Sequence, residues 1–426
     1  MADVLIIGSG GREDALRQAM LASPEVARAE VHSSVEQGVE AFRGSSDVFS
    51  IVGPEAALVD GASDYLRELG HTVLGVSQEA AQYEASKAKA IRTVPELFPQ
   101  TFIADGSDMP DKARAFVEMN EPGSYYIKAN GLAAGKGSIG PHSRDHAIQV
   151  IEDMISGGYD GAGTEIINFQ ELITGPEVSP VALVGRNGDF VILPYAQDHK
   201  KLLAGDQGPN TGGTGAYTPV PESLVNANEH AEIEEMIATA LEKAAAQGTP
   251  IEQGVLYAGV IKDLGSDGKP RTSRVFKFME WNIRFGDPET QSQLASMVAS
   301  GVDVYRLLRS AADGDLEKPN IDLQKLPVAA LTVALMANGY PVKAQTGEVI
   351  YGIDQEYQGV TLQKAGMKFE DGKWITSSGR VVYATGVGED IDEAADRTFA
   401  AIGKNGVHFK DMHYRHDIGW QARTRF

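Results

Sequence analysis

The sequence predicts a multidomain protein of mixed α/β and α+β class, with an open parallel sheet at its N-terminus and further α+β units behind it. The chain has 426 residues, and single hydrophobic cores usually stop growing at roughly 250–300 residues. Strand-like and helix-like segments alternate over the first hundred residues, which favours a parallel sheet. A proline-rich connector at 95–99 and the linker-like GDLEKPN then separate the later units.

The expected elements follow from the periodicity of apolar residues. The apolar run VLIIG leads into a glycine-rich turn and a helix, which is a βα unit whose turn suits a phosphate. Apolar runs at 48–52 and 72–76 flank a helix-like segment at 61–69. Further along we expect strands at 125–128, 165–170, 178–184, 255–262 and 275–281, helices at 146–155, 231–247, 291–312 and 390–402, and a polar loop at 198–215.

Composition excludes several classes of function. The net charge of −21 argues against a general nucleic-acid binder, because phosphate backbones repel an acidic surface. The absence of cysteine excludes disulfides, thiolate metal sites and a cysteine nucleophile. No apolar run approaches the ~18 residues of a membrane helix, and the N-terminus has no basic leader. We therefore expect a soluble, cytoplasmic protein with no membrane or nucleic-acid partner.

The segment YIKANGLAAGKG at 126–137 indicates a phosphate-covering loop. Lys128 and Lys136 bracket small residues, which let backbone N–H groups approach a polyphosphate while the ammonium groups neutralise it. It is not a P-loop, because Gly137 stands where that motif has Ser or Thr. An ordinary glycine-rich hairpin is the alternative for this loop taken alone.

The segment MEWNIRFGDPETQ at 279–291 indicates a metal site. Strand alternation places Glu280 and Asn282 on one face, and both offer oxygen ligands suited to a hard divalent cation such as Mg²⁺. Arg284 follows on the same face, where it can neutralise a transferring phosphoryl group or bind a carboxylate. A salt-bridge network at a strand edge is the alternative.

These two segments, with four other strings in the same order, resemble the glycinamide ribonucleotide synthetase family of the ATP-grasp superfamily. The other strings are GGRED, VGPEAALVDG, QDHKKLLAGDQGPNTGGTGAYTP and YRHDIGW, so the resemblance covers residues 4 to 420. It implies an ATP-dependent carboxylate–amine ligase that joins glycine to phosphoribosylamine through glycyl phosphate, with ATP and Mg²⁺ or Mn²⁺ as cofactors. It also implies a monomer or weak homodimer.

The resemblance implies roles for particular residues. The expected catalytic residues are Arg284, Lys136 and Asp287. The expected ATP-binding residues are Lys87, Lys128, Gly135, Lys136, Gly137, Glu171 and Glu177, and the metal ligands are Glu280 and Asn282. The expected substrate-binding residues are Gly10, Gly11, Arg12, Glu13, Asp198, Lys200, Asn210, Thr211, Gly212, Gly213, Asp287 and Glu289. Neither motif nor spacing selects His199 as a general base.

The resemblance also implies three domains. We expect a Rossmann-like substrate domain at 1–98, an ATP-grasp domain at 99–320 with a lid at about 122–188, and a small C-terminal α+β domain at 321–426. The lid is expected to close over the nucleotide.

Two other functions remain open on the sequence alone. The G-x-G-G turn is compatible with an NAD-dependent dehydrogenase, although that reading leaves the lysine loop and the Glu280 segment unexplained. A paralogue with another acid or amine is suggested by departures from the family at Asp14, Thr214, Ser138 and the missing proline–glycine–asparagine turn. Asp14 either faces the substrate phosphate, where it would repel it, or only caps the first helix.

Overall fold

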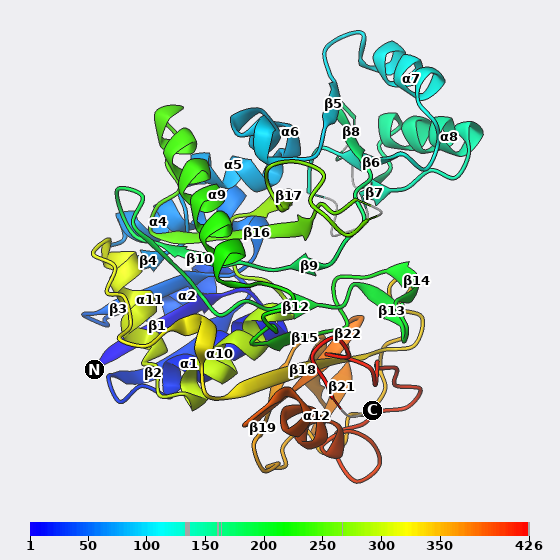
Figure 1. The fold of residues 1–426 in the computed structure, drawn as a ribbon. Helices are drawn as coiled ribbons and strands as arrows, with labels where there is room; N and C mark the ends of the chain where they lie inside the picture. The colour runs from blue at the N-terminus through cyan, green and yellow to red at the C-terminus, as the bar shows by residue number, and fades with distance from the viewer. Residues whose placement is uncertain (133–136, 160–161, 163, 266, 425–426) are drawn as a thin grey trace.

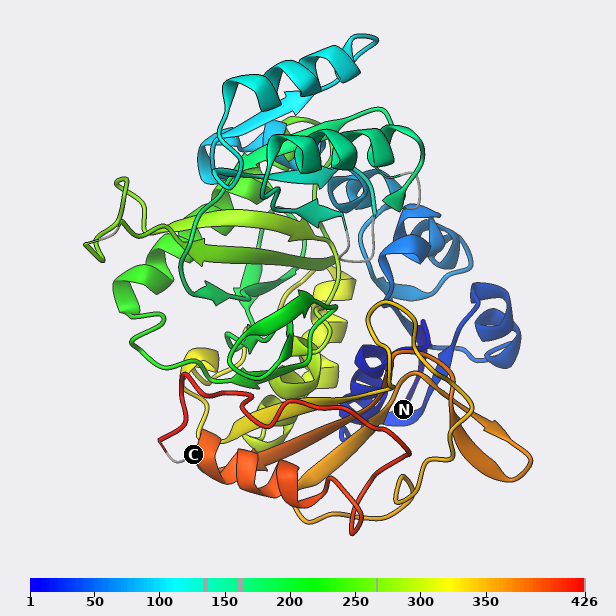
Figure 2. The same cartoon turned by 90° about the vertical axis from the view of Figure 1, so that its right-hand side faces the viewer.

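The computed structural model describes residues 1–132, 137–159, 162, 164–265 and 267–424. In Figure 1 the strands β5, β6, β7 and β8 of the lid lie at the upper right, and the C-terminal sheet lies at the bottom. Figure 2 shows the lid and the C-terminal sheet again at opposite ends of the molecule. Among the described residues, no helix is both long and apolar enough to cross a membrane.

The N-terminal unit is a parallel sheet, as the alternation of apolar runs predicts. Its strands follow the order β2-β1-β3-β4, and every pairing is parallel. Val4 to Ile7 are buried because helices cover both faces of the sheet. The elements are β1 (Ala2–Ile7), α1 (Gly11–Leu21), β2 (Val26–His32), α2 (Val35–Ala41), β3 (Val48–Val52), α3 (Glu55–Val59), α4 (Ala62–Glu68) and β4 (Thr72–Leu74).

A connector then leads to the lid, a four-stranded sheet of order β5-β8-β6-β7 with two helices. Pro95 begins a single 3₁₀ turn, η1, which ends before Pro99, because proline is tolerated in a first helical turn but cannot continue a helix. Phe116, Tyr125 and Phe169 form the aromatic core of the lid. The elements are α5 (Gln78–Ala85), α6 (Lys87–Thr93), η1 (Pro95–Leu97), β5 (Thr101–Ala104), α7 (Met109–Met119), β6 (Tyr125–Ala129), β7 (Ser138–Ile139), α8 (Arg144–Ile155) and β8 (Ile167–Glu171).

The central sheet has the order β11-β10-β16-β17, and β9 also pairs with β16. Trp281 of β17 packs against Tyr83, Phe98 and Phe278, which ties the connector to this sheet. The predicted strand at 178–184 is wrong as one element, because Pro180 lacks an N–H group and separates two strands. The elements are β9 (Glu177–Val178), β10 (Val181–Val184), β11 (Phe190–Ile192), α9 (Ala227–Ala246), β16 (Gly254–Lys262) and β17 (Phe276–Asn282).

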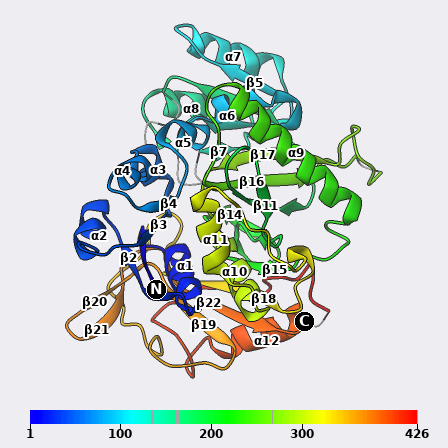
Figure 3. The ribbon, with the colours of Figure 1, turned by 90° about the vertical axis from the view of Figure 1, so that its left-hand side faces the viewer.

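The predicted single helix at 291–312 is also wrong, since two helices occupy this segment. They are α10 (Glu289–Ala299) and α11 (Val304–Asp313). Gly301 adopts a left-handed φ of +83°, and the Asp303 side chain caps the second helix by accepting from Arg306 N. Helix α10 lies beside α1, as Figure 3 shows.

The C-terminal sheet has the order β12-β15-β18-β22-β19 and therefore includes strands from the segment expected to be a polar loop. That expectation is wrong, because 198–215 contains a hairpin of β13 and β14 between two strands of the sheet. The boundaries expected at 98, 188 and 320 remain predictions. The elements are β12 (Gln197–Asp198), β13 (Lys201–Leu203), β14 (Gln207–Asn210), β15 (Gly215–Thr218), η3 (Leu323–Lys325), β18 (Ala329–Met336), β19 (Val360–Lys364), β20 (Met367–Glu370), β21 (Lys373–Thr376), β22 (Arg380–Gly388) and α12 (Ile391–Ala400).

Candidate active site

Two lysines, Lys128, which is buried, and Lys87, which is half-buried, face the space between the lid and the central sheet. Lys128 of β6 donates to Gln170 Oε1 at 2.5 Å and to the Met279 carbonyl at 3.3 Å. Burial lowers its pKa to about 8, although Glu280 acts in the opposite direction. Lys87, the first residue of α6, donates to the Gly131 carbonyl at 2.9 Å, and burial lowers its pKa too. Both ammonium groups thus lie in a partly desolvated place where they attract phosphate strongly.

The expected metal ligands lie at the end of β17, next to these lysines. Burial raises the pKa of Glu280, but Lys200, Lys128 and Lys87 outweigh it and bring the pKa to about 2. The carboxylate is therefore ionised, and its Oε1 lies 3.7 Å from Lys200 Nζ.

Asn282 is buried, and its amide nitrogen has no hydrogen-bond partner in the described part of the chain. Its amide oxygen, the atom that would bind a cation, accepts from Arg284 Nη2 at 3.3 Å. No cluster of three His, Asp or Glu side chains occurs among the described residues. An anionic and an amide oxygen fit Mg²⁺, which takes its remaining ligands from phosphates and water.

Arg284 is held by two carboxylates from the first hundred residues. Its Nε lies 3.0 Å from Glu55 Oε2 and 3.1 Å from Glu84 Oε1. Glu84 is buried and also accepts from Ile283 N at 2.7 Å. Burial lowers the pKa of Arg284, but Glu84 and Glu55 raise it further, so the guanidinium stays charged. Glu55 and Glu84 were not among the expected site residues, although Glu55 lies in the VGPEAALVDG string.

The two glutamates expected at the nucleotide have basic partners in this structure. Glu171 ends β8 and pairs with Arg271 Nη2 at 2.5 Å. Glu177 begins β9, and its Oε2 lies 3.6 Å from Lys200 Nζ. Lys200 therefore lies between Glu177 and Glu280, within 4 Å of each.

Two more expected residues, Asp198 and Glu289, lie on β12 and at the start of α10. Burial raises the pKa of Asp198 to about 7, against the influence of Lys200. Glu289 is buried, and its Oε1 accepts from Tyr257 Oη at 2.6 Å and Ser179 Oγ at 3.2 Å. His199 is also buried, and burial lowers its pKa to about 4. A neutral imidazole next to Gln421 Oε1 at 3.1 Å fits a packing role for His199.

A cavity of about 1090 Å³ lies between the N-terminal turn, the lid and the C-terminal sheet. It brings together six of the residues expected to bind substrates. The other six expected residues do not line it: Arg12, Glu13, Asp198, Lys200, Gly213 and Glu289. The six that line it are Gly10, Gly11, Asn210, Thr211, Gly212 and Asp287, and the C-terminal part adds Tyr340, Ser377, Ser378, Arg380 and Tyr383.

Arg12 and Glu13 shape the turn instead of lining this cavity. Glu13 accepts from Gly10 N at 2.7 Å and from Arg12 Nε at 2.6 Å. Arg12 Nη1 donates to the Phe285 carbonyl at 3.1 Å. A Cβ on Gly11 would lie 2.3 Å from the Tyr383 ring, so the start of α1 packs directly on that ring.

Two departures from the family pattern, Asp14 and Thr214, lie in packing contacts. Asp14 accepts from Arg17 Nε at 2.8 Å, Gln18 Nε2 at 3.0 Å and Lys364 N at 2.9 Å. This matches the alternative in which Asp14 serves its own helix and points away from a ligand. Thr214 is fully buried and donates to the His199 carbonyl at 2.7 Å.

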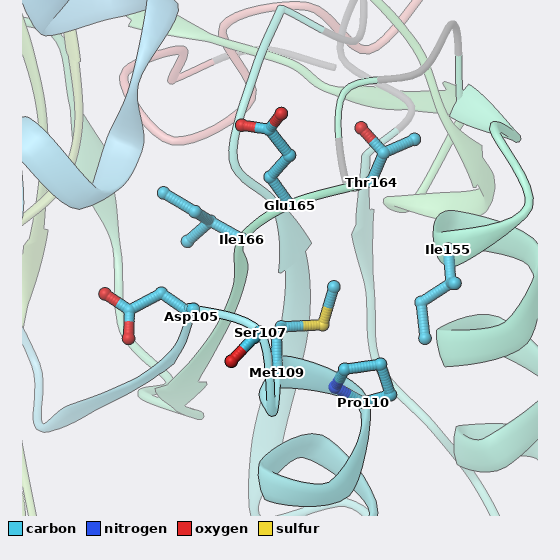
Figure 4. Close-up of a pocket in the computed structure, with 9 residues that line it drawn as sticks. Asp105, Ser107, Met109, Pro110, Ile155, Thr164, Glu165 and Ile166 are labelled. Atoms are coloured by element: carbon cyan, nitrogen blue, oxygen red, sulfur yellow. The ribbon is translucent and has the colours of Figure 1, made fainter.

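A second cavity of about 560 Å³ lies within the lid, between the loop after β5 and the end of α8 (Figure 4). Its charged lining side chains among the described residues are Asp105 and Glu165, both acidic. A polyphosphate does not suit that lining.

The tip of the lysine loop is only partly described. Gly135 and Lys136 lie outside the described residues. Gly137 is described, and its carbonyl accepts from Ala129 N at 2.8 Å, which closes the base of the loop.

Comparisons with known proteins agree with this arrangement. Residues 99–290 match the family model of the phosphoribosylglycinamide synthetase ATP-grasp (A) domain, and residues 330–421 match that of the C domain. The phosphoribosylamine–glycine ligase of Vibrio parahaemolyticus is 36% identical, with 99% of each chain covered. That of Neisseria meningitidis is 35% identical, covering 99% of this chain and 100% of its own.

Solved structures show the same architecture. The phosphoribosylamine–glycine ligase of Thermotoga maritima superposes with a TM-score of 0.81 at 28% identity, covering 98% of this chain and 100% of its own. A biotin carboxylase domain from Hydrogenobacter thermophilus, solved with MgADP, is similar in fold alone, with a TM-score of 0.68, 14% identity and 96% and 91% coverage. The Rossmann-like N-terminal sheet and the ATP-grasp fold are thereby confirmed. By its sequence along the whole length, this chain belongs to the phosphoribosylamine–glycine ligase family.

Proposed function

We propose that this chain ligates glycine to phosphoribosylamine at the expense of ATP, giving glycinamide ribonucleotide, ADP and phosphate. The observation that carries the proposal is the full-length similarity to ligases of that name. The site agrees with it, because lysines surround Glu280, and Asp287, a few residues further along the chain, lines the large cavity. The cofactors are ATP and Mg²⁺, with Mn²⁺ as a substitute of the same charge and similar ligand preference.

The reaction needs ATP because a carboxylate does not react with an amine. A glycine carboxylate oxygen attacks the γ-phosphorus and expels ADP, which leaves glycyl phosphate. The amine nitrogen of phosphoribosylamine then attacks the glycyl carbonyl, loses a proton and expels inorganic phosphate. Asp198 has a pKa of about 7 and can accept that proton near neutral pH.

The side chains of the site each have a task in this scheme. Lys128 and Lys87 bind the phosphates and stabilise charge in the transferring group. Glu280 and Asn282 hold the divalent cation, which when bound neutralises phosphate charge. Arg284, fixed by Glu55 and Glu84, is positioned to contact the reacting phosphoryl group or the glycine carboxylate.

The adenosine part is assigned to the segment after β8. Glu177 accepts hydroxyls of the ribose, and the backbone following Glu171 reads the adenine edge. The lysine loop with Gly135, Lys136 and Gly137 is assigned to the ATP phosphates. Closure of this loop would exclude water that otherwise hydrolyses the acyl phosphate.

Ser138, one of the departures behind the alternative of another amine, lines the cavity. Asp14 and Thr214, which prompted that alternative, are engaged in packing and do not line the cavity. The alternative of an NAD-dependent dehydrogenase is wrong, because the chain belongs to a ligase family.

The remaining expectations concern the setting of the enzyme. We propose a cytoplasmic monomer or weak homodimer that uses small-molecule substrates. The net charge of −21 supports the absence of a nucleic-acid partner.

The test is phosphate release from ATP with a panel of amino acids and amines. Glycine together with phosphoribosylamine should stimulate turnover more than any other pair. Stronger stimulation by another acid or amine would overturn the proposed substrates while leaving the ligase chemistry in place.

A further inference from the structure

Arg380, the first residue of β22, contacts two separate segments of the cavity. Its Nη1 donates to the carbonyl oxygens of Gly212 at 2.5 Å and Asp287 at 2.8 Å. Its Nη2 donates to Asp287 Oδ2 at 2.9 Å. One guanidinium from the C-terminal sheet thereby fixes the glycine segment and Asp287 relative to each other.

The Asp287 carboxylate depends on this contact for its charge. Its side chain is 18% exposed, and that of Arg380 is 21% exposed. Burial raises the pKa of Asp287, but Arg380 more than compensates with help from Arg12, so the net shift is downward. Gln291 Nε2 donates to the other carboxylate oxygen at 2.6 Å but carries no charge. Removing a buried partner leaves an uncompensated charge, which is costly.

The glycine segment is packed so closely that Arg380 and Tyr340 set its shape. A Cβ on Gly212 would lie 3.2 Å from Arg380 Cζ and 3.3 Å from Tyr340 Oη. Gly212 N donates to Tyr340 Oη at 3.0 Å. Gly213 has φ +109°, and a Cβ there would lie 2.4 Å from Pro288 Cδ.

These groups meet at the cavity whose other wall is the start of α1. The volume of about 1090 Å³ is at the upper end of the ~300–1,000 Å³ typical of small-molecule sites. Asp287 and Gly212 line it, and the carboxylate and carbonyl oxygens of these two residues are the kind of acceptor that hydroxyls and an amine require. Both terminal nitrogens of Arg380 are already bonded to protein oxygens, so this residue acts through its neighbours.

We propose that Arg380 is a positioning residue for the ribosylamine, holding Asp287 and the Gly212–Gly213 backbone in the arrangement that binds it. The inference rests on the proposed function, because that function names the molecule in the cavity. With Arg380, the acceptor site extends into the C-terminal sheet, where no sequence motif predicts a site residue.

The test is steady-state kinetics on full-length Arg380→Lys and Arg380→Ala. Lysine keeps the charge but loses the planar fork, so both variants should raise the KM for phosphoribosylamine about tenfold or more, while the KM for ATP changes less than about twofold. Added guanidinium should partly restore the KM in Arg380→Ala. The matched control is Arg397→Ala, because Arg397 also lies in the C-terminal part but pairs with Glu393 at 2.5 Å away from the cavity lining.

Several outcomes would overturn this role. An unchanged KM for phosphoribosylamine in both variants, or equal changes in both substrates' KM values, would show that Arg380 contributes only packing. If Arg380→Ala does not fold, Arg380→Lys and Tyr340→Phe still decide, since Tyr340→Phe removes only one hydroxyl and should raise the same KM to a smaller extent. Wild-type protein that ignores phosphoribosylamine in this assay would instead refute the proposed function, and this inference with it.

Discussion

At the scale of single residues, Lys128 illustrates how burial adjusts a phosphate-binding group. Its ammonium lies among Gln170, Met279 and Glu280, and burial brings its pKa to about 8. Free lysine has a pKa of about 10.4. The ammonium is therefore present below pH 8 in the folded protein and is lost as the pH rises through that value.

This pKa leads to a prediction about pH dependence. We expect kcat/KM for ATP to fall above about pH 8, because kcat/KM reports the ionisation of the free enzyme. Lys128→Arg should lack this decrease, since arginine stays charged. The free energy of unfolding should rise between pH 8 and about 10.4, where the unfolded chain binds the extra proton. A wild-type profile that stays flat to pH 9.5 would contradict the assignment.

The metal ligands lead to a second prediction. Glu280→Ala should lower turnover roughly 10³-fold or more, because it removes the one charged ligand from the expected metal pair. Asn282→Ala should be milder, since it removes a neutral ligand. Steady-state turnover at saturating Mg²⁺ measures both effects, and circular dichroism checks that each variant is folded. Near-normal turnover in folded Glu280→Ala would show that the metal assignment is wrong.

What the sequence could predict at this scale depended on local pattern. Glu280, Asn282 and Arg284 share one strand end, so alternation alone brought them together. Glu55 and Glu84 reach Arg284 from 229 and 200 positions away by sequence number, and Arg380 reaches Asp287 across 93. Contacts between distant segments carry no local signal, which explains why these three residues were missed.

At the scale of elements, Asp14 links α1 to β19. Two of its three hydrogen bonds stay within α1, and the third joins this helix to the Lys364 backbone, 350 positions away. The sequence allowed two orientations for the Asp14 side chain: toward a phosphate bound at the turn of Gly10 and Gly11, or toward its own helix. Only the packing of the C-terminal sheet against α1 selects one.

A third prediction follows for Asp14. Asp14→Ala should destabilise the protein by about 1–3 kcal/mol, because three donors lose their acceptor. The KM for phosphoribosylamine should stay unchanged. Thermal unfolding and substrate titration measure the two effects, with Asp14→Asn as the variant that keeps an acceptor. An unchanged melting temperature with a lower KM would restore the alternative in which Asp14 repels the substrate phosphate.

Arg415 anchors the β13–β14 hairpin to the C-terminal tail. Its side chain is fully buried and pairs with Asp206 at 2.8 Å and Asp417 at 2.8 Å. Nη1 also donates to the Lys201 carbonyl at 3.2 Å. The sequence contained this residue in the YRHDIGW string but could not show what it holds.

A fourth prediction concerns this anchor. Arg415→Ala should cost about 3–5 kcal/mol of stability, since it leaves two carboxylates without their buried partner. Urea unfolding measures the loss, and Lys410→Ala, a 71% exposed side chain, is the control expected to match wild type. Superimposable unfolding curves for Arg415→Ala and wild type would refute the anchor.

The misplaced elements have a common physical cause. The helical periodicity of apolar residues continues through 291–312. The helix nevertheless ends near Gly301, and Asp303 caps a new one. The packing of α10 and α11 offsets the free energy lost by interrupting the helix. The segment at 198–215 is rich in glycine and polar residues, which favours a loop locally. Its pairing with β18 comes from a strand more than a hundred residues later.

At the scale of the whole molecule, two sites meet near the end of β17. The nucleotide side contains Lys87, Lys128 and Glu280, and the acceptor side is the cavity at Gly11 and Asp287. The connector, the lid and the central sheet supply the first, whereas the N-terminal turn, the lid and the C-terminal sheet enclose the second. This division permits the phosphoryl transfer and the amine attack to be examined one at a time.

The last prediction uses this separation. Glycine and ATP without any amine should yield glycyl phosphate, which hydroxylamine traps as a hydroxamate that is measured by its iron complex. Glu280→Ala should lose the hydroxamate in proportion to overall turnover, because both depend on the same phosphoryl transfer. Formation of hydroxamate only when an acceptor analogue is present would mean that the amine must bind first. Absence of hydroxamate from glycine, together with its formation from another amino acid, would identify a different carboxylate as the substrate.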